Sequence, residues 1–190
     1  MSLPAAPLGA GPDEFLTWER EQTERHVYFR GEVFAMSGGT PRHSALSATI
    51  LSLLRLPKGP CHVHTSDLRL GVANDHFVYA DAVMVCGPVE LRPGTTDVLT
   101  NPSVIVEVLS KSTEAYDRGE KQAAYLALPS LRHFLLVSQR ELRVEVYTRE
   151  ADARFRYDIH RAGARVLLTE PTVSFAVDEL YDGMFALPGD

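Results

Sequence analysis

The spacing of hydrophobic and polar residues changes several times along the chain, and each change indicates a new element. Residues 13–21 (DEFLTWERE) have the spacing of a short amphipathic helix. Two alternating runs, HVYF and EVFA, flank Arg30-Gly31 and predict a β-hairpin. Apolar residues then recur at helical spacing over residues 41–56, after a Thr-Pro pair typical of a helix N-terminus. The N-terminal part is therefore expected to form a helix, a hairpin and a second helix that buries one face.

Strand patterns dominate the middle of the chain. The runs CHVHTSDLRLGV and HFVYADAVMVC predict two strands joined near Asn74-Asp75, and residues 87–102 (GPVELRPGTTDVLTNP) predict a loop. The next run, SVIVEVLS, is apolar almost without interruption, which is typical of a strand buried on both faces. We therefore expect this last strand at the centre of the sheet.

A helix is expected after the central strand, ending at Pro129. Its start is open, because Asp117 and Glu120 fit a capping-box pattern while Ser112 or Thr113 could cap an earlier start. The remaining sequence predicts further strands and a final short helical segment, in the runs HFLLVS, LRVEVYTRE, RFRYDIHRAG, RVLLT and VDELYDGMF.

This order of elements predicts one mixed α/β (α+β) domain with a sheet core. A chain of 190 residues, 45% of them hydrophobic, is long enough to bury such a core. Residues 1–11, rich in Ala, Gly and Pro, predict a flexible tail, and residues 12–188 the domain itself.

The formal net charge of -6 argues against a non-specific nucleic-acid coat, but not against a DNA-acting enzyme with a local basic groove. The first residues lack the basic start and apolar core of a signal peptide, and no apolar run approaches the roughly 20 residues that span a bilayer. We therefore expect a soluble cytoplasmic protein in which Cys61 and Cys86 are reduced thiols.

Candidate chemistry begins with Glu107, which stands in the middle of the apolar strand. An ionised carboxylate in such a setting is costly unless it is paired or bound to a metal. Asp81 begins another strongly apolar strand. Two adjacent strands that each present one carboxylate at the same sheet edge would offer the oxygen ligands that Mg²⁺ or Mn²⁺ prefer. Lys121 could reach this pair from the following helix.

Each of these residues also has an ordinary structural explanation. Glu107 could form a buried ion pair with an arginine or with Lys121, and Asp81 could cap a strand end. Lys121 could pair with Asp117 at i,i+4 on a solvated helix face. The chain has 16 arginines and three lysines, which slightly favours a special role for a lysine. The histidines lack convincing zinc spacing, and Walker, GxGxxG and GxSxG motifs are absent.

Several segments occur in the order of one bacterial family: RGEVFAMSGGTPRHSALS, YADAVMV, VIVEVLSKSTEAYDRGEKQAAY and VEVY. Over residues 13–182 the chain resembles the Uma-two family, a branch of the PD-(D/E)XK nuclease superfamily. The block VEVLSxST…D…EK…Y is the most specific part of the resemblance. The resemblance implies a restriction-endonuclease-like fold, in which a central mixed sheet is flanked by helices and carries carboxylates at one edge.

The resemblance also assigns roles to residues. Asp81 is similar to the aspartate of the "PD" element and Glu107 to the acidic residue of "(D/E)XK", so both would be catalytic and metal-binding. The backbone carbonyl of Val108 would be a further metal ligand. Glu32 resembles an additional acidic residue that the family carries near the site.

Two departures from the superfamily motif are visible. Ala80 replaces the proline before Asp81, and Leu109 stands where the motif lysine is expected. The family resemblance implies that the lysine has moved to the following helix, where Lys121 is the matching residue.

Weaker expectations concern substrate contacts. His43, in the PRH pattern, could contact phosphate or cap its own helix, and Tyr125 could orient Lys121 or belong to the core. Arg42 and Arg118 are candidate contacts to DNA phosphates. The expected activity is metal-dependent hydrolysis of the DNA backbone by a homodimer. A non-catalytic binding or regulatory module that retains the fold, and an RNA-directed nuclease, remain as alternatives.

Overall fold

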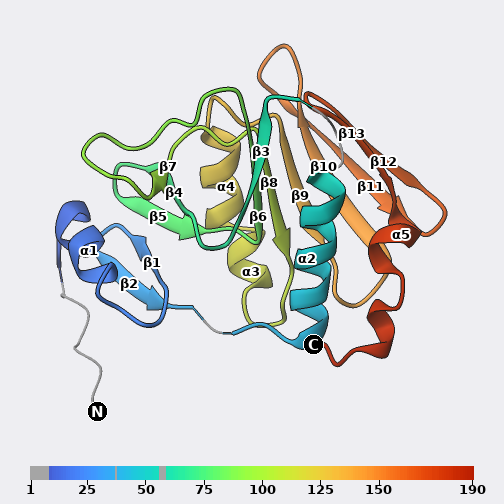
Figure 1. The fold of residues 1–190 in the computed structure, drawn as a ribbon, viewed down its shortest axis with the longest axis horizontal. Coiled ribbons are helices and arrows are strands. Elements are labelled where there is room, and N and C mark those ends of the chain that lie inside the picture. Colours follow the sequence, from blue (N-terminus) through green and yellow to red (C-terminus); the bar gives the residue numbers. More distant parts are fainter. Residues whose placement is uncertain (1–8, 37, 56–58) are drawn as a thin grey trace.

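A computed structural model describes residues 9–36, 38–55 and 59–190 (Figure 1). Residues 1–8 of the expected tail lie outside the described residues. The helices are α1 (Pro12–Glu19), α2 (Pro41–Arg55), α3 (Glu114–Asp117), α4 (Glu120–Ala127), α5 (Val177–Tyr181) and the 3-10 turn η1 (Met184–Ala186). The strands are β1 (His26–Phe29), β2 (Glu32–Ala35), β3 (Cys61–Thr65), β4 (Arg69–Ala73), β5 (His76–Tyr79), β6 (Ala82–Cys86), β7 (Val98–Leu99), β8 (Val104–Val108), β9 (His133–Val137), β10 (Arg143–Arg149), β11 (Phe155–Arg161), β12 (Arg165–Thr169) and β13 (Thr172–Ala176).

A six-stranded sheet in the order β11-β10-β9-β8-β6-β3 forms the centre of the fold. It is mixed, because β8 and β9 run parallel while the other neighbours are antiparallel. Strand β8 lies between β9 and β6 and is buried at all five positions. The expectation that this apolar strand is central is therefore confirmed. A five-stranded sheet, β2-β1-β5-β4-β7, and the pair β12-β13 complete the strands.

Helices and smaller sheets cover both faces of the six-stranded sheet (Figure 1). On one face, α2, α5 and the β12-β13 pair bury a common apolar cluster with the sheet. On the other face, α4 packs with residues of β4 and β5. Helix α2 contributes Leu46, Ile50 and Leu54 to the first cluster, each almost completely buried. Burial of each such side chain is worth about 1.5–3 kcal/mol, so these contacts fix α2 on the sheet.

The two long strands expected between residues 61 and 86 are in fact four, and this expectation is wrong. The chain leaves the central sheet after β3, forms β4 and β5 in the second sheet, and returns as β6. Polar side chains mark both crossing points. At the first, Thr65 accepts the Asp67 backbone N–H. At the second, Asp81 accepts a hydrogen bond from the backbone of β8. The short β7 lies in the expected loop, and β13 was not anticipated.

The single helix expected before Pro129 is also divided, into α3 and α4. The break falls at Gly119, where an added Cβ would lie 2.9 Å from the backbone oxygen of Ala115. A side chain could not be accommodated there without a shift of the backbone. Of the two starts left open, the capping box of Asp117 and Glu120 is not formed, because the Asp117 carboxylate accepts a hydrogen bond from Thr113 and pairs with Lys121. The helical segment begins earlier, after Thr113, as the alternative has it.

The prediction of reduced thiols is contradicted as well. Cys61 and Cys86 lie directly opposite each other on β3 and β6 and form a disulfide, with a Cα–Cα distance of 4.0 Å. Their pairing depends on the register of two antiparallel strands, which the spacing of two cysteines does not reveal. Within the described ranges, no helix is long and apolar enough to cross a membrane.

Candidate active site

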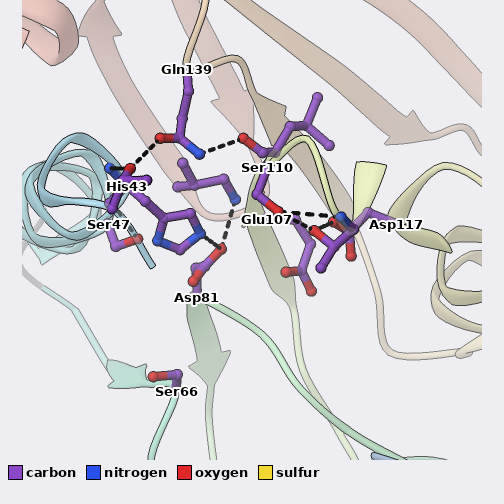
Figure 2. Close-up of polar contacts among 12 residues, drawn as sticks. His43, Ser47, Ser66, Asp81, Glu107, Ser110, Asp117 and Gln139 are labelled. Atoms are coloured by element: carbon purple, nitrogen blue, oxygen red, sulfur yellow. Dashed lines mark hydrogen bonds and ion pairs between the residues drawn. The ribbon is translucent and has the colours of Figure 1, made fainter. Parts of the chain in front are cut away.

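Asp81 and Glu107 lie at the same end of two neighbouring strands. Strands β6 and β8 are antiparallel, and Ala82 is paired with Val106 in their register. One step further along each strand, this register places Asp81 opposite Glu107. Figure 2 shows the two carboxylates at this end of the sheet. The structure thus brings together the two acidic residues that the sequence analysis selected.

Glu107 is held by two side chains from one face of α4. The Lys121 ammonium nitrogen lies 2.8 Å from Glu107 Oε1, and the Tyr125 hydroxyl donates to the same oxygen at 2.7 Å. Lys121 and Tyr125 are one helical turn apart, so both point to β8. All three are buried, with 4% of Glu107, 6% of Lys121 and none of Tyr125 exposed. Tyr125 therefore fixes the carboxylate directly, rather than the lysine ammonium.

Asp117 is a fourth member of this cluster that the sequence analysis did not place in the site. It is 3% exposed, and its Oδ1 lies 3.4 Å from Lys121 Nζ. Its Oδ2 accepts a 2.6 Å hydrogen bond from the Thr113 hydroxyl. The i,i+4 spacing of Asp117 and Lys121 indicated this pair, but on a solvated face. The sequence alone does not show that α3 and α4 pack against β8.

Asp81 is held from a different side, by β8 and α2. Its Oδ2 accepts the Val108 backbone N–H at 2.7 Å and lies 3.4 Å from His43 Nε2 (Figure 2). The Asp81 side chain keeps 17% of its surface exposed and that of His43 keeps 19%. Solvent therefore reaches the site on the Asp81 side, whereas the Glu107 side is closed by α4.

Gln139 ties the start of α2 to the end of β8, a role that the sequence analysis missed. Its amide nitrogen donates to the Leu109 carbonyl at 2.8 Å, and its amide oxygen accepts the Thr40 hydroxyl at 2.8 Å (Figure 2). Gln139 is 1% exposed, so both bonds are shielded from water. The Thr40 hydroxyl oxygen also accepts the His43 backbone N–H at 3.2 Å, so this connection reaches the residue beside Asp81.

The electrostatics of the cluster are dominated by burial and by an excess of carboxylates. The pKa of Glu107 is raised to about 8, mainly by burial; Lys121 opposes this shift, and Asp117 and Asp81 add to it. Burial alone would lower the pKa of Lys121, but Glu107 and Asp117 raise it overall. Lys121 is therefore a stable ammonium ion, and Glu107 binds a proton easily while no further cation is near.

A divalent cation fits this donor set. Among the contacts of the described residues, Asp81 Oδ1 and Glu107 Oε2 take no part in a hydrogen bond or ion pair. Glu107 and Asp117 share Lys121, and the nearby Asp81 carboxylate adds to the repulsion at Glu107, so a cation would relieve it. In the described part of the chain, no three His, Cys, Asp or Glu side chains form a complete ligand group. The Val108 carbonyl and water would therefore have to complete the coordination.

The remaining predicted site residues are placed differently. All three guanidinium nitrogens of Arg42 donate to backbone carbonyls, those of Gln139, Met184 and Leu187. Arg118 forms a bidentate pair with Glu145 and a third bond to Glu114. Both arginines would have to exchange these bonds to contact phosphate. Glu32 is exposed on β2, and among the described contacts none joins it to Asp81 or Glu107.

Comparison with known proteins gives consistent results. The model of the family Uma2, described as "Putative restriction endonuclease", matches residues 12–178. Two relatives come from Synechocystis sp. (strain ATCC 27184 / PCC 6803 / Kazusa). "Uncharacterized protein slr1290" is 37% identical over 95% of this chain and 96% of its own length. "Uncharacterized protein sll1609" is 30% identical over 75% of this chain and 82% of its own length.

A solved structure shares the fold. The crystal structure of a "putative nuclease belonging to DUF820" from Anabaena variabilis ATCC 29413 superposes with a TM-score of 0.71 over 90% of this chain and 97% of that chain. The sequence identity is 17%, so the likeness concerns the fold. The mixed α+β, restriction-endonuclease-like fold expected from the sequence is confirmed.

Proposed function

The chain belongs to the Uma2 family, and from that premise we propose that it is a metal-dependent endonuclease that hydrolyses the DNA backbone. The observation that carries the proposal is the buried Glu107–Lys121 contact of 2.8 Å beside Asp81. Carboxylates can hold a metal ion that activates water, and an ammonium ion can offset negative charge on a phosphate, so this cluster offers the groups that phosphodiester hydrolysis uses.

In this proposal Asp81 and Glu107, with the Val108 carbonyl, hold Mg²⁺ or Mn²⁺. When bound, the cation would polarise a phosphoryl oxygen and lower the pKa of a water molecule. Asp81 is pre-positioned for binding by the Val108 N–H, and Glu107 by Tyr125. Because Glu107 has a pKa of about 8, it must release its proton to act as a ligand.

Lys121 acts as a cation and not as a base. Its raised pKa keeps the ammonium protonated at neutral pH, so it cannot accept a proton from water. It can instead orient a water molecule and offset the negative charge that develops on the phosphate. Removal of one such donor from an active site typically costs about 10²–10³ in rate.

The proposal extends to substrate contacts and assembly. His43, at the exposed side of the site beside Asp81, would contact the substrate phosphate. Glu32, Arg42 and Arg118 are retained as proposed substrate or metal contacts that require local rearrangement. The protein would act in the cytoplasm as a homodimer, so that two sites cut two strands.

Purified protein should be tested with supercoiled plasmid, single-stranded DNA and RNA in the presence of Mn²⁺. We expect nicking of DNA that a chelator abolishes and that Asp81→Ala eliminates. Glu179→Gln, which changes an exposed carboxylate on α5, is the matched control and should retain activity. Activity that survives Asp81→Ala would come from a contaminating nuclease or another site, and would contradict the proposal.

A non-catalytic binding module is the second candidate. The hydrogen bonds of Arg42 and Arg118 favour it. Both guanidinium groups donate to acceptors within the chain, so neither is available to bind a DNA phosphate without rearrangement. Wild-type protein that is inert on all three substrates with several divalent metals would support this candidate. Cleavage of RNA alone would keep the nuclease class and change the substrate.

A further inference from the structure

Strand β11 forms a long outer edge of the six-stranded sheet. It pairs with β10 along its whole length, from Phe155 to Arg161, and stands at the end of the strand order. Within the described ranges, no strand pairs with its other side. An edge strand presents backbone N–H and C=O groups that can pair with another chain, and natural proteins usually shorten, cover or twist such edges.

This edge also exposes large apolar side chains. Tyr157 and Ile159 are each 46% exposed. They are two residues apart, so they lie on the same face of the strand. Arg156 and Asp158 occupy the opposite face, where they pair with each other at 3.1 Å while Arg156 also contacts Glu150, and these exposed pairs would be exchanged for pairs across an interface. An exposed edge with one apolar row and one charged row is suited to a partner that offers the same two rows.

The sequence of β11 is complementary to itself. In a symmetric antiparallel pair of two β11 strands, the two-fold axis passes midway between the two copies of one residue, and residues at equal distances from that residue face each other. With the axis at Tyr157, Phe155 faces Ile159 of the second copy, and Arg156 faces Asp158. Apolar residues then meet apolar residues, and each arginine meets an aspartate of the other copy.

Neighbouring registers are less favourable. An axis at Arg156 would bring two arginines face to face, and an axis at Asp158 two aspartates, both destabilising arrangements. An axis at Ile159 would place Tyr157 against Arg161 and leave Phe155 without an apolar partner. The charged and apolar residues therefore favour the register centred on Tyr157 over its neighbours.

We propose that two copies of this chain associate through β11, in antiparallel register about Tyr157, to form one continuous sheet. The partner is a second copy, because the recognition pattern is that of the strand itself. This inference names a surface and a register for the homodimer of the proposed function, and it does not rest on nuclease activity. A metal-dependent nuclease could be monomeric, and a non-catalytic module could associate in the same way.

Charge-reversal variants of Arg156 and Asp158 provide the test, with self-association measured by sedimentation equilibrium. Wild-type protein should be a dimer at micromolar concentration. Arg156→Asp would oppose two aspartates in each of the two symmetric pairs, and Asp158→Arg would oppose two arginines. We expect each variant alone to associate at least tenfold more weakly than the wild type. An equimolar mixture of the two variants should associate again, because each pair then joins an arginine to an aspartate.

Two controls complete the experiment. Arg165→Asp makes the same charge change at an exposed position on β12 and should leave association unchanged. Circular dichroism should show that all variants are folded, since Arg156 and Asp158 are surface residues. Wild-type protein that stays monomeric, single variants that dimerise normally, or a mixture that associates no better than its components would each overturn the proposal. Activity measurements are not needed, so its failure is distinguishable from that of the nuclease proposal.

Discussion

The Lys121 ammonium lies 2.8 Å from the Glu107 carboxylate, joining helix α4 to the central strand β8. Both partners are buried, so neither can replace the other with water. The same carboxylate oxygen, Oε1, also accepts a hydrogen bond from the Tyr125 hydroxyl, and neither contact uses Oε2. This contact supplies the compensation that a glutamate in an apolar strand requires, and it places a cation beside a pair of candidate metal ligands.

Lys121→Ala should lower nuclease activity by about 100-fold or more while metal binding is largely kept, because the ammonium acts on substrate rather than as a ligand. Lys121→Arg should not restore activity, since the planar guanidinium is bulkier than the compact ammonium. Initial rates of plasmid nicking, at saturating Mn²⁺, measure both effects. Full activity in Lys121→Ala would remove the lysine from the mechanism without removing the nuclease class.

Mg²⁺ or Mn²⁺ should stabilise the fold, because a ligand that binds only the native state shifts the unfolding equilibrium. At 100 times its dissociation constant the gain is about 2.7 kcal/mol. For a chain of this size such a gain raises the melting temperature by about 5–10 °C. Thermal unfolding with and without metal measures the shift.

Glu107→Gln should abolish this metal response, and the exposed Glu179→Gln should keep it. An equal shift in Glu107→Gln and wild type would locate the cation at some other site. The glutamine is close in size to glutamate, so loss of the response would reflect the missing charge and not a cavity.

Reduction of the Cys61–Cys86 disulfide should destabilise the protein. The bridge joins residues 25 positions apart, and a loop of this length corresponds to about 3.5 kcal/mol in the chain-entropy account. A reductant should therefore lower the melting temperature of wild-type protein. A Cys61→Ser, Cys86→Ser double variant should melt lower from the start and be insensitive to reductant.

Thiol titration of the denatured protein checks the pairing itself. No thiol should react before reduction, and both cysteines should react afterwards. Two reactive thiols in protein purified without reductant would restore the reduced state that the sequence analysis expected for a cytoplasmic protein.

Local patterns predicted much of this architecture. The hairpin at Arg30-Gly31 follows from alternation around a turn, and the structure gives both residues positive φ angles. The central position of β8 follows from its continuous apolar run. In both cases the signal lies within a few residues, because it reflects the environment of one element.

Properties that depend on how distant elements meet could not be predicted in this way. The crossing at Asp81 looks like an uninterrupted strand in the sequence, since Ala80 and Ala82 flank it. The polar turn at Ser66-Asp67 is too short to separate two strands by pattern alone. The candidate site could be predicted only in part. Glu107 was conspicuous by its apolar neighbours, whereas Asp117 and Gln139 are polar residues in polar stretches and become notable only through burial.

The pH dependence of stability should report the state of Glu107. Its pKa of about 8 in the folded protein lies above its ordinary value of 4.5, so the folded state retains a proton that the unfolded state has lost. This contribution to stability is complete below the ordinary value and is lost as the pH rises to about 8. In chelator, the wild type should therefore lose stability relative to Glu107→Gln between pH 5 and pH 9.

The comparison with Glu107→Gln is needed because buried histidines act in the opposite direction. Burial lowers the pKa of His76 and of His133 to about 4, so their contributions are lost as the pH falls from the ordinary value of 6.5. These residues are present in both proteins, and the difference between the two unfolding free energies isolates Glu107. Denaturant unfolding at each pH measures that difference. A difference that instead stays constant between pH 5 and pH 9 would mean that Lys121 keeps Glu107 ionised throughout.

Metal should reverse this trend. Binding requires the ionised carboxylate, so the affinity for Mg²⁺ should increase as the pH rises towards 8, and each binding event near neutral pH should release a proton. Calorimetric titration in two buffers of different ionisation enthalpy counts that proton directly. We expect the number of protons released to approach zero above pH 9. In a Glu107→Asp variant, that number should approach zero at neutral pH only if the shorter carboxylate loses its buried position. If the stability measurements show a protonated Glu107, absence of proton release at pH 7 would show that the cation does not bind at Glu107, whatever the activity of the protein.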